Sequence, residues 1–405
     1  MRILILSHWF TPEPTFKGLR FARELQKLGH EVEVLTGFPN YPGGKIYPGY
    51  KIKLYQREMM DGVPVIRVAL YPSHDASALR RIANYVSFAI SATLLGPFLV
   101  RKPDVIYVYH PPATVALPAV VLGWLRRAPF VYDVNDLWPD TLAATGMLNN
   151  RMLLRLIGTW SRWTYRAARR VTVISKGFAR KLEERGVPAA KISMIYNWAE
   201  ECIVEGAAKA ERREPGFEGH FNIVFAGTMG KAQALDAVID AAALVGRRHQ
   251  QVRFVFIGAG VEVERLKART LNAGLSNVVF LPRRPVEEIA TVLASADVLL
   301  VHLKDDPLFA ITIPSKTQAY LAAGRPIIMA VRGDAADLVK EADAGVTCEP
   351  ENAESIAAAV EQLWNATPER RRQMGENGRA FYRSRLSMEK AAESFARVLS
   401  ESATR

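Results

Sequence analysis

Short runs of apolar residues alternate with helical patterns along the first 200 residues. Runs with the length of a buried strand occur at residues 3–6, 31–35, 65–68, 105–109, 130–134 and 171–174. Between the first two runs, Phe21, Leu25 and Leu28 are spaced as on one face of a helix, and Gly29 can end that helix. Strands that alternate with helices predict βαβ units and a parallel sheet.

A second alternation of the same kind begins after residue 219. Strands are expected at residues 222–225, 253–257, 278–280, 298–301 and 327–330, with helical patterns between them. Residues 201–219 are charged and small and include Pro215, a composition typical of a surface linker. We therefore predict an α/β protein with two Rossmann-like, doubly wound domains, at residues 1–200 and 220–385.

The composition is that of a globular protein. The chain has 405 residues, of which 49% are apolar and 23% charged, and this length suits two domains. The two cysteines lack metal-ligand spacing, and the opening apolar run is too short for a signal peptide, so a reducing, cytoplasmic location is expected. A net charge of +12 favours an anionic partner.

Glycines follow two of the predicted strands. Gly18 begins the helix after the first strand, and Gly227 and Lys231 lie between a strand and a helix of the second domain. Ligands of doubly wound sheets bind outside the carboxyl ends of the strands, where a helix N-terminus can bind phosphate. Glycine also occurs in such turns without any ligand, and the pair Gly258 and Gly260 leaves the same two alternatives open.

The segment 307–330 contains a lysine in an unusual position. Pro314 and Ser315 can begin a helix, which places Lys316 in the first turn, followed by Thr317 and Gln318. A cation there opposes the helix dipole unless an anion is bound. The alternatives are a phosphate-binding lysine and an ordinary solvated lysine.

His110 and Asp136 each follow a predicted strand of the first domain. If these strands are neighbours, both side chains lie at one edge of the sheet. A histidine can donate to a hydroxyl or phosphoryl oxygen, and a carboxylate can accept from sugar hydroxyls. A structural histidine is the alternative.

The order of several motifs resembles a known family. These motifs are GLRFARELQKLGHEVEVLT, VYHPP, VYDVNDLWPD, FAGTMGKAQALD and IPSKTQAYLAAGRPI. The chain is similar to the retaining GT-B glycosyltransferases of family 4 (group 1), and DLWPD and PSKTQAYLAAGRP resemble its bacterial O-antigen and capsule branch, which includes fucosyl and N-acetylfucosaminyl transferases. The resemblance implies an interdomain cleft, and a final helix at residues 386–405 that crosses back to the first domain.

The resemblance also implies roles for individual residues. Gly18 matches a glycine that faces the donor phosphates, and His110 matches a histidine that contacts the transferred sugar. Asp136 matches the acidic member of a His–Asp pair whose histidine is here Asn135. The activity implied is retaining transfer from a UDP-sugar, or second a GDP-sugar, in the synthesis of a cell-surface polysaccharide.

Two departures from the family pattern concern the donor site. The usual phosphate-binding Arg and Lys are replaced by Thr228 and Gln233, and no carboxylate occurs in residues 307–333, where the family has a Glu-x7-Glu pair. Either other residues bind the donor, or the chain is a catalytically idle nucleotide-sugar-binding homologue. The residues expected to bind the donor phosphates are Gly18, Gly227, Lys231, Ser315, Lys316, Thr317 and Gln318.

No Asp-x-Asp motif is present, so we expect neither a metal ion nor any other cofactor. Lys231, Lys316 and a helix N-terminus can together stabilise the charge on a leaving nucleoside diphosphate. His110 and Asp136 are then expected to orient the sugar.

Residues 82–100 contain no charge and are bracketed by Arg80–Arg81 and Arg101–Lys102. The stretch approaches the length of a membrane span, but a span would place two strands of one sheet on opposite sides of the bilayer. The stretch could instead form a buried helix or a helix that lies in the membrane interface.

Residues 151–170 predict a basic amphipathic helix. Leu156, Trp160 and Trp163 fall on one face, and Arg155, Arg162 and Arg166 on another. Such a helix is typical of a membrane surface. We expect contact with the inner face of the cytoplasmic membrane and with a polyprenyl-diphosphate-linked saccharide as acceptor; a core helix with a solvated arginine face is the alternative.

Two further classes of function are disfavoured. No nucleic-acid recognition module is present, so no nucleic-acid partner is expected. A nicotinamide-dependent oxidoreductase would need G-x-G-x-x-G after the first strand, where this chain has SHWFTPEPTFKG.

Overall fold

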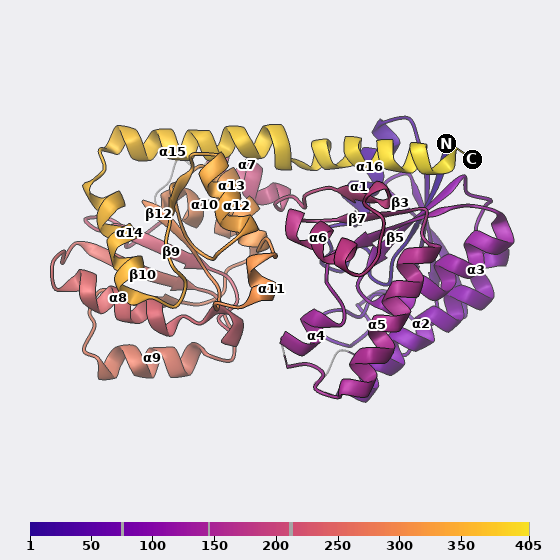
Figure 1. The fold of residues 1–405 in the computed structure, drawn as a ribbon, viewed down its shortest axis with the longest axis horizontal. Helices are drawn as coiled ribbons and strands as arrows, with labels where there is room; N and C mark the ends of the chain where they lie inside the picture. Colours follow the sequence, from indigo (N-terminus) through magenta and orange to yellow (C-terminus); the bar gives the residue numbers. More distant parts are fainter. Residues whose placement is uncertain (74–76, 145, 210–213, 405) are drawn as a thin grey trace. The chain divides into compact units, whose positions relative to one another are not determined.

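The computed structural model describes residues 1–73, 77–144, 146–209 and 214–404, and the chain divides into two compact units (Figure 1). Unit 1 comprises Met1–Tyr196 and Met388–Arg405, and unit 2 comprises Asn197–Ser387. Both are α/β units with a largely parallel sheet, as the alternating patterns predict. The divisions fall at 196/197 and 387/388, whereas the sequence suggested 200 and 385.

The sheet of unit 1 has eight strands in the order β3-β4-β2-β1-β5-β6-β7-β8. Every neighbouring pair is parallel except β3 and β4. The central strand β5 is buried along its whole length. The strands are β1 (Arg2–Leu6), β2 (Glu31–Gly37), β3 (Tyr55–Met60), β4 (Val63–Val68), β5 (Val105–His110), β6 (Phe130–Val134), β7 (Arg170–Val173) and β8 (Ile192–Met194).

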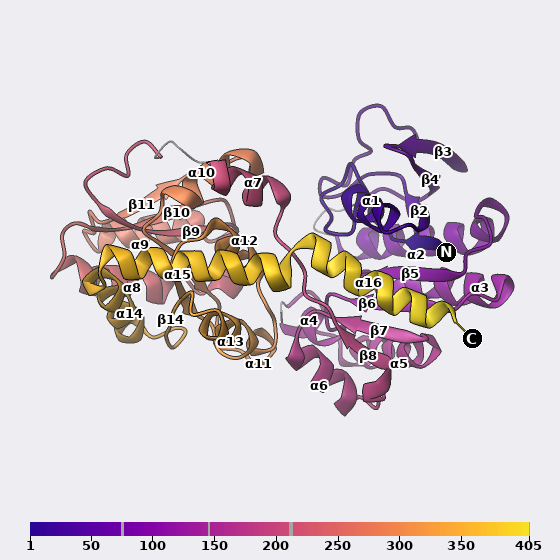
Figure 2. The same ribbon diagram turned by 90° about the horizontal axis from the view of Figure 1, so that it is seen from above.

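Helices cover both faces of this sheet. α1 and α16 pack together on one face, with α16 along β5 and β6, while α2, α3 and α5 lie on the other (Figures 1 and 2). Right-handed crossovers between parallel strands produce this division. The helices are α1 (Leu19–Lys27), α2 (Ala78–Leu99), η1 (Ala113–Val115), α3 (Ala116–Arg126), α4 (Asp140–Ala144), α5 (Arg151–Ala167), α6 (Lys176–Glu184), η2 (Ala189–Lys191) and α16 (Met388–Ala403).

The sheet of unit 2 has six parallel strands in the order β11-β10-β9-β12-β13-β14. They are β9 (Phe221–Ala226), β10 (Val252–Ile257), β11 (Val278–Leu281), β12 (Val298–His302), β13 (Ile327–Ala330) and β14 (Gly345–Thr347). β9 and β10 bring Phe225, Phe254 and Phe256 into a core that α8 and α14 close. The order reverses between β9 and β12, which is where an open α/β sheet forms a ligand site.

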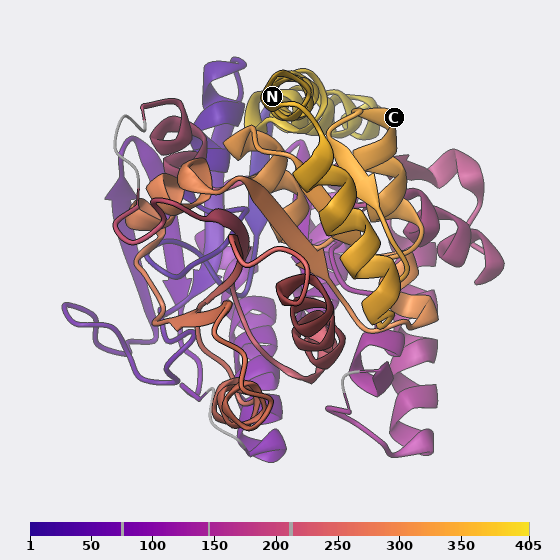
Figure 3. The ribbon, with the colours of Figure 1, turned by 90° about the vertical axis from the view of Figure 1, so that its left-hand side faces the viewer.

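The helices of unit 2 also lie on both faces of the sheet (Figure 3). α8 packs on α14, and α7 packs on α10 and α12. They are α7 (Glu201–Lys209), η3 (Lys231–Gln233), α8 (Asp236–Gly246), α9 (Val263–Asn272), α10 (Val286–Ser295), α11 (Pro307–Ala310), α12 (Ser315–Ala323), α13 (Asp334–Glu341), α14 (Ala353–Asn365), α15 (Pro368–Phe381) and η4 (Tyr382–Leu386), the last a π-helical turn.

The predicted linker at residues 201–219 differs from the structure at its start. Residues 201–209 form α7, which buries Ile203 and packs Gly206 against Ala290 of α10. A Cβ on Gly206 would lie 2.5 Å from the Cβ of Ala290, so the small residues that suggested a linker are those that allow close helix packing. Residues 210–213 of the same segment lie outside the described residues.

Candidate functional site

His110 is the last residue of β5 and is almost fully buried. Burial lowers the pKa of its imidazole to about 3, so the ring is neutral at physiological pH. Within the described residues, its Nδ1 has no hydrogen-bond partner. The ring contacts Tyr132 and Trp138, with centroid distances of 5.5 Å to each. A neutral imidazole held between aromatic rings can hydrogen-bond to a ligand without contributing charge.

Asp136 follows β6, the strand beside β5, so the structure places it at the same edge of the sheet as His110. Its side chain is only partly exposed, and burial raises the pKa of the carboxyl to about 6. The carboxylate forms at neutral pH and can accept hydrogen bonds from hydroxyl groups. The neighbouring Asn135 instead turns inward and donates to Asp133 Oδ2 at 2.9 Å.

Gly18 is the N-cap of α1, and the loop before it folds back tightly. A Cβ on Gly18 would lie 2.7 Å from Thr11 Oγ1, which is too close for any larger residue without a shift. Thr11 Oγ1 accepts the N–H of Leu19 at 2.9 Å. The glycine therefore allows Thr11 to satisfy a free N–H group at the start of the helix.

A buried ion pair that the sequence pattern did not predict lies behind this loop. Lys17 is fully buried, with Nζ 4.0 Å from Asp133 Oδ2. Tyr107 and Thr172 donate to the same carboxylate, at 2.5 and 2.7 Å, and Nζ lies 4.6 Å from the ring centroid of Phe395. Burial lowers the pKa of Lys17 to about 8, although Asp133 raises it. The only signal in the sequence was a carboxylate inside the apolar run FVYDV.

Glu13 is a second buried group that the sequence pattern did not predict. Its carboxylate accepts the N–H groups of Phe10, Asn40 and Tyr41 at 2.8–3.1 Å. It thereby joins the loop after β1 to the loop after β2, at the carboxyl edge of the sheet. Burial raises the pKa of Glu13 to about 7, against the lowering effect of these N–H groups and of Arg67.

In unit 2, two glycine loops meet at the carboxyl ends of β9 and β10. Gly227 and Gly258 have φ values of +138° and +147°, and a Cβ on Gly258 would lie 2.0 Å from the carbonyl oxygen of Gly227. The next residues continue the contact, because Met229 N–H donates to Ala259 O at 2.9 Å. The close approach of the backbones at Gly227 and Gly258 therefore requires glycine at position 258, whether or not a ligand binds. Only glycine adopts this conformation without strain.

Lys316 lies beside these loops. The hydroxyl of Tyr320, one turn further along α12, accepts the N–H of Ala226 at 2.9 Å and so ties α12 to the end of β9. Lys316 Nζ lies 3.4 Å from the ring centroid of Phe225, and a Cβ on Gly227 would be 2.6 Å from Lys316 Cε. Burial lowers the pKa of Lys316 to about 7. The lysine is therefore not an ordinary solvated one, and it is held beside the glycine loops at the carboxyl ends of β9 and β10.

The other residues expected at this site lie at different depths. Ser315 and Lys231 are exposed, the latter at the start of η3, whereas Thr317 and Gln318 are buried on the inner side of α12. Gln233 accepts the N–H of Gly230 at 2.9 Å. The exposed side chains and Lys316 can meet a ligand directly, whereas Thr317 and Gln318 are covered.

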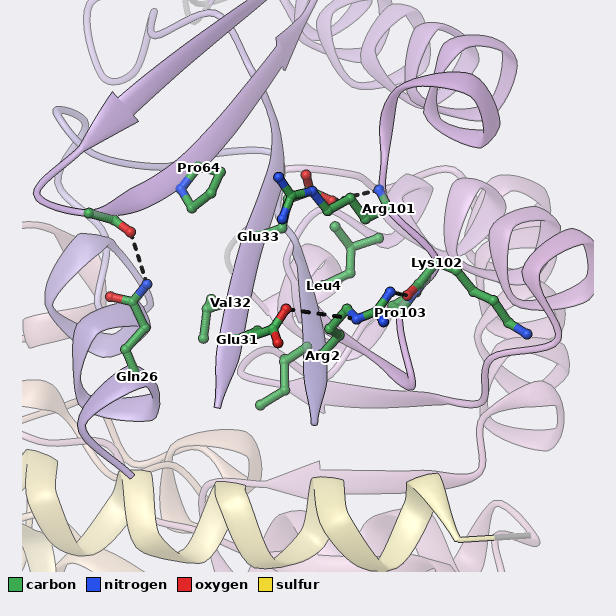
Figure 4. A pocket seen from close by; sticks show the side chains of 12 residues that line it. Arg2, Leu4, Gln26, Glu31, Val32, Glu33, Pro64, Arg101, Lys102 and Pro103 are labelled. Carbon is green, nitrogen blue, oxygen red and sulfur yellow. Dashed lines mark hydrogen bonds and ion pairs between the residues drawn. The ribbon is translucent and has the colours of Figure 1, made fainter. Parts of the chain in front are cut away.

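Two further observations concern where a ligand could bind. No group of metal-ligating side chains occurs within the described ranges. A pocket of about 180 Å³ lies at the amino ends of β1 and β2, the opposite edge from His110 (Figure 4). Arg2 there pairs with Glu31 at 3.7 Å, and the N–H of Arg101 donates to Glu33. This pocket therefore lies away from the edge where ligands of such sheets bind.

The basic helix α5 leaves both predicted faces at the surface. Its buried residues are Ser161, Thr164 and Tyr165. Trp163 is exposed, while Trp160 is half-buried and its Nε1 donates to Ala113 O at 3.0 Å. Arg155, Arg162 and Arg166 are all exposed. The helix is thus not a core helix with a single solvated face.

Several known proteins with similar sequences are glycosyltransferases. Residues 19–198 match the family profile described as a glycosyl transferase 4-like domain, and residues 208–381 match that of glycosyl transferases group 1. The putative colanic acid biosynthesis glycosyl transferase WcaI of Escherichia coli (strain K12) is 27% identical over 89% of this chain and 92% of its own length. The probable glycosyltransferase WbjE of Pseudomonas aeruginosa is 25% identical over 65% of this chain and 66% of its own length.

Solved structures show the same fold. HepE of Anabaena, crystallised with UDP and glucose, superposes with a TM-score of 0.69 at 17% identity, over 98% of this chain and 99% of that one. The UDP-forming trehalose-phosphate synthase of Burkholderia xenovorans gives a TM-score of 0.73 at 12% identity, over 100% and 99%. The two profiles, the two parallel sheets and the reversal of strand order at β9 and β12 agree, and the chain belongs to the family 4 (group 1) glycosyltransferases with the GT-B fold.

Proposed function

We propose that this glycosyltransferase moves a sugar, with retention, from a nucleoside-diphosphate sugar to a polyprenyl-diphosphate-linked saccharide in the synthesis of a cell-surface polysaccharide. The observation that carries the donor half of the proposal is Lys316, held beside Gly227 at the carboxyl end of β9. The name of WcaI, a putative colanic acid biosynthesis glycosyl transferase, supports the polysaccharide half. UDP, which HepE binds, is the first choice of nucleotide, and GDP the second.

Each group has a defined role in this proposal. Lys316 and the exposed Lys231 neutralise the leaving diphosphate. The leaving phosphate oxygen takes the proton of the acceptor hydroxyl while the new glycosidic bond forms on the same face. The neutral His110 and the carboxylate of Asp136 hydrogen-bond to the sugar. We expect this chemistry to need no metal ion.

A nucleotide screen tests the proposal. Thermal shift of the full chain with UDP, GDP and ADP should identify one stabilising nucleotide, and the corresponding nucleotide sugars should then be hydrolysed slowly without acceptor. Stabilisation by none of the three nucleotides would contradict the donor assignment. Addition of EDTA should leave hydrolysis unchanged.

The absence of carboxylates from residues 307–333 favours a second candidate, a nucleotide-sugar-binding homologue without catalysis. The same screen separates the two candidates. An idle homologue would be stabilised by a nucleotide sugar yet would neither hydrolyse it nor transfer the sugar to a lipid-linked saccharide extracted from membranes.

Binding of a nucleotide sugar is expected to weaken as the pH rises above about 7. The pKa of Lys316 is lowered to about 7 in the free protein, so the side chain is a charged ammonium below this pH. Above this pH the neutral amine must take up a proton when the nucleotide sugar binds. The affinity should fall by up to about tenfold per pH unit. Calorimetry of UDP-glucose binding in buffers of different ionisation enthalpy should show proton uptake at pH 8, because the diphosphate of the sugar nucleotide does not titrate there.

The variant Lys316→Arg is the matched control for this titration, since it keeps the charge at every pH. It should bind without proton uptake. Equal proton uptake by the native protein and this variant would show that another group is responsible.

A further inference from the structure

The helix α2 presents an apolar surface that is larger than a soluble helix normally exposes. Within Leu79–Leu99, an 18-residue window has a mean hydropathy of 1.5, and only 28% of that window is buried. Six apolar side chains with exposed fractions between 40% and 85% follow one another every three or four positions; we call them the α2 stripe. They are Leu79, Ile82, Val86, Ile90, Leu94 and Phe98. A continuous exposed surface of this kind marks an interaction site.

The opposite side of α2 is fixed to unit 1. Asn84 is buried, with Oδ1 2.7 Å from His8 Nε2, and its Nδ2 donates to Asn40 Oδ1 at 3.1 Å. Phe88 and Ala92 are buried, and Gly96 packs against Leu35 and Leu122. The helix connects β4 to β5 of one parallel sheet and packs along β2, β4 and α3. It therefore lies on the sheet and does not extend away from it to cross a bilayer.

Polar groups on α2 do not interrupt the stripe. Thr93 donates back to Ala89 O at 2.6 Å, and Ser87 donates to Asn84 O at 3.0 Å and accepts from Tyr71 N–H. Both hydroxyls are hydrogen-bonded within the protein. They therefore keep these partners when water is removed from the stripe. The apolar stripe can enter a non-aqueous phase at little cost.

Positive charge surrounds the stripe. Arg80 and Arg81 lie between its first two residues, and Arg101 and Lys102 follow its last. At the amino edge of the sheet, Arg126 donates to Val100 O at 3.3 Å and joins the end of α3 to the end of α2. Trp124, Leu125 and Arg127 are exposed there. Arginine and lysine beside apolar and aromatic groups match the headgroup region of an anionic bilayer.

A second copy of the chain suits this surface less well. In a two-fold antiparallel pairing of α2 helices, Arg80 and Arg81 of one copy would face Arg101 and Lys102 of the other. Like charges that meet across an interface oppose association. We propose that the α2 stripe docks on an anionic lipid bilayer, with α2 lying in the plane of the interface. The purpose of such docking rests on the lipid-linked acceptor of the proposed function. The evidence for the docking is the apolar and basic surface of α2.

Vesicle sedimentation of the full chain tests the inference. The native protein should sediment with vesicles of phosphatidylcholine and phosphatidylglycerol, and less with pure phosphatidylcholine or at high salt. The variant Ile90→Glu/Leu94→Glu should bind about a hundredfold more weakly, at about tenfold for each apolar group removed from the bilayer. The matched control is Val261→Glu/Leu271→Glu, two substitutions at exposed apolar residues of unit 2, and it should bind as the native protein does.

Further measurements keep the test decisive. The side chain of Phe98 is 85% exposed, so Phe98→Ser should leave the thermal melt unchanged and still weaken vesicle binding. Native-like vesicle binding by the α2 variants would overturn the inference. So would a native dimer that the α2 variant converts to monomer, since a second copy would then cover the stripe. Failure of the native protein to bind nucleotides would contradict the proposed function alone, because the vesicle assay contains no nucleotide.

Discussion

Replacing Lys316 by alanine is expected to weaken the binding of the donor nucleotide by about a hundredfold, or ~3 kcal/mol. Lys316 is the cation held beside the glycine loops of unit 2, and the ring of Phe225 and the tie from Tyr320 to Ala226 fix its position. Turnover should fall further when Lys231 is also replaced, because both charges stabilise the leaving diphosphate. Calorimetry with the nucleoside diphosphate and donor hydrolysis kinetics would measure the two effects.

A lysine elsewhere in unit 2 provides a control for the loss of one positive charge away from the site. Lys340 is exposed in α13, and Lys340→Ala should bind and hydrolyse the donor as the native chain does. Unchanged affinity and turnover in the double variant Lys231→Ala/Lys316→Ala would refute the assignment of the diphosphate to these lysines.

Replacing Asp133 by alanine should destabilise unit 1 by ~3–5 kcal/mol, because the ammonium of Lys17 would then be buried without its carboxylate. The hydroxyls of Tyr107 and Thr172 would lose their acceptor as well. The melting temperature of unit 1, followed by tryptophan fluorescence, should fall by about 10 °C.

An exposed ion pair of the same unit is the matched control. Arg23 and Asp61 lie 3.3 Å apart at the surface, and Asp61→Ala should cost less than about 1 kcal/mol. The double variant Lys17→Met/Asp133→Leu removes both charges and should recover most of the loss. If Asp133→Ala melted at the native temperature, Lys17 would not depend on Asp133 for its burial.

The central strands of both sheets could be predicted because they depend on local patterns. Continuous apolar runs identified these strands, and polar residues at or just after the strand ends suggested His110 and Asp136 as candidates. The edge strand β3 was missed because its residues alternate between exposed and half-buried and carry no apolar run. β8 and β14 have only three residues each, too few for a pattern.

The buried charges could not be predicted, since their partners are distant in sequence. Lys17 and Asp133 meet only because β1 and β6 flank β5, and Glu13 meets Asn40 only where two loops fold together. Which side of α12 faces inward also depends on tertiary packing, so Thr317 and Gln318 could not be separated from Lys316 by sequence.

Unit 1 is assembled from both ends of the chain, and this affects how the protein is made. During synthesis the whole of unit 2 is made before α16, so Phe395 reaches Phe21, Tyr107 and Lys17 only after unit 2 has been synthesised. Until then the face of the sheet that α16 covers is open. Unit 2 is one uninterrupted segment and is suited to expression alone, whereas a fragment that ends at residue 387 would leave unit 1 without its last helix.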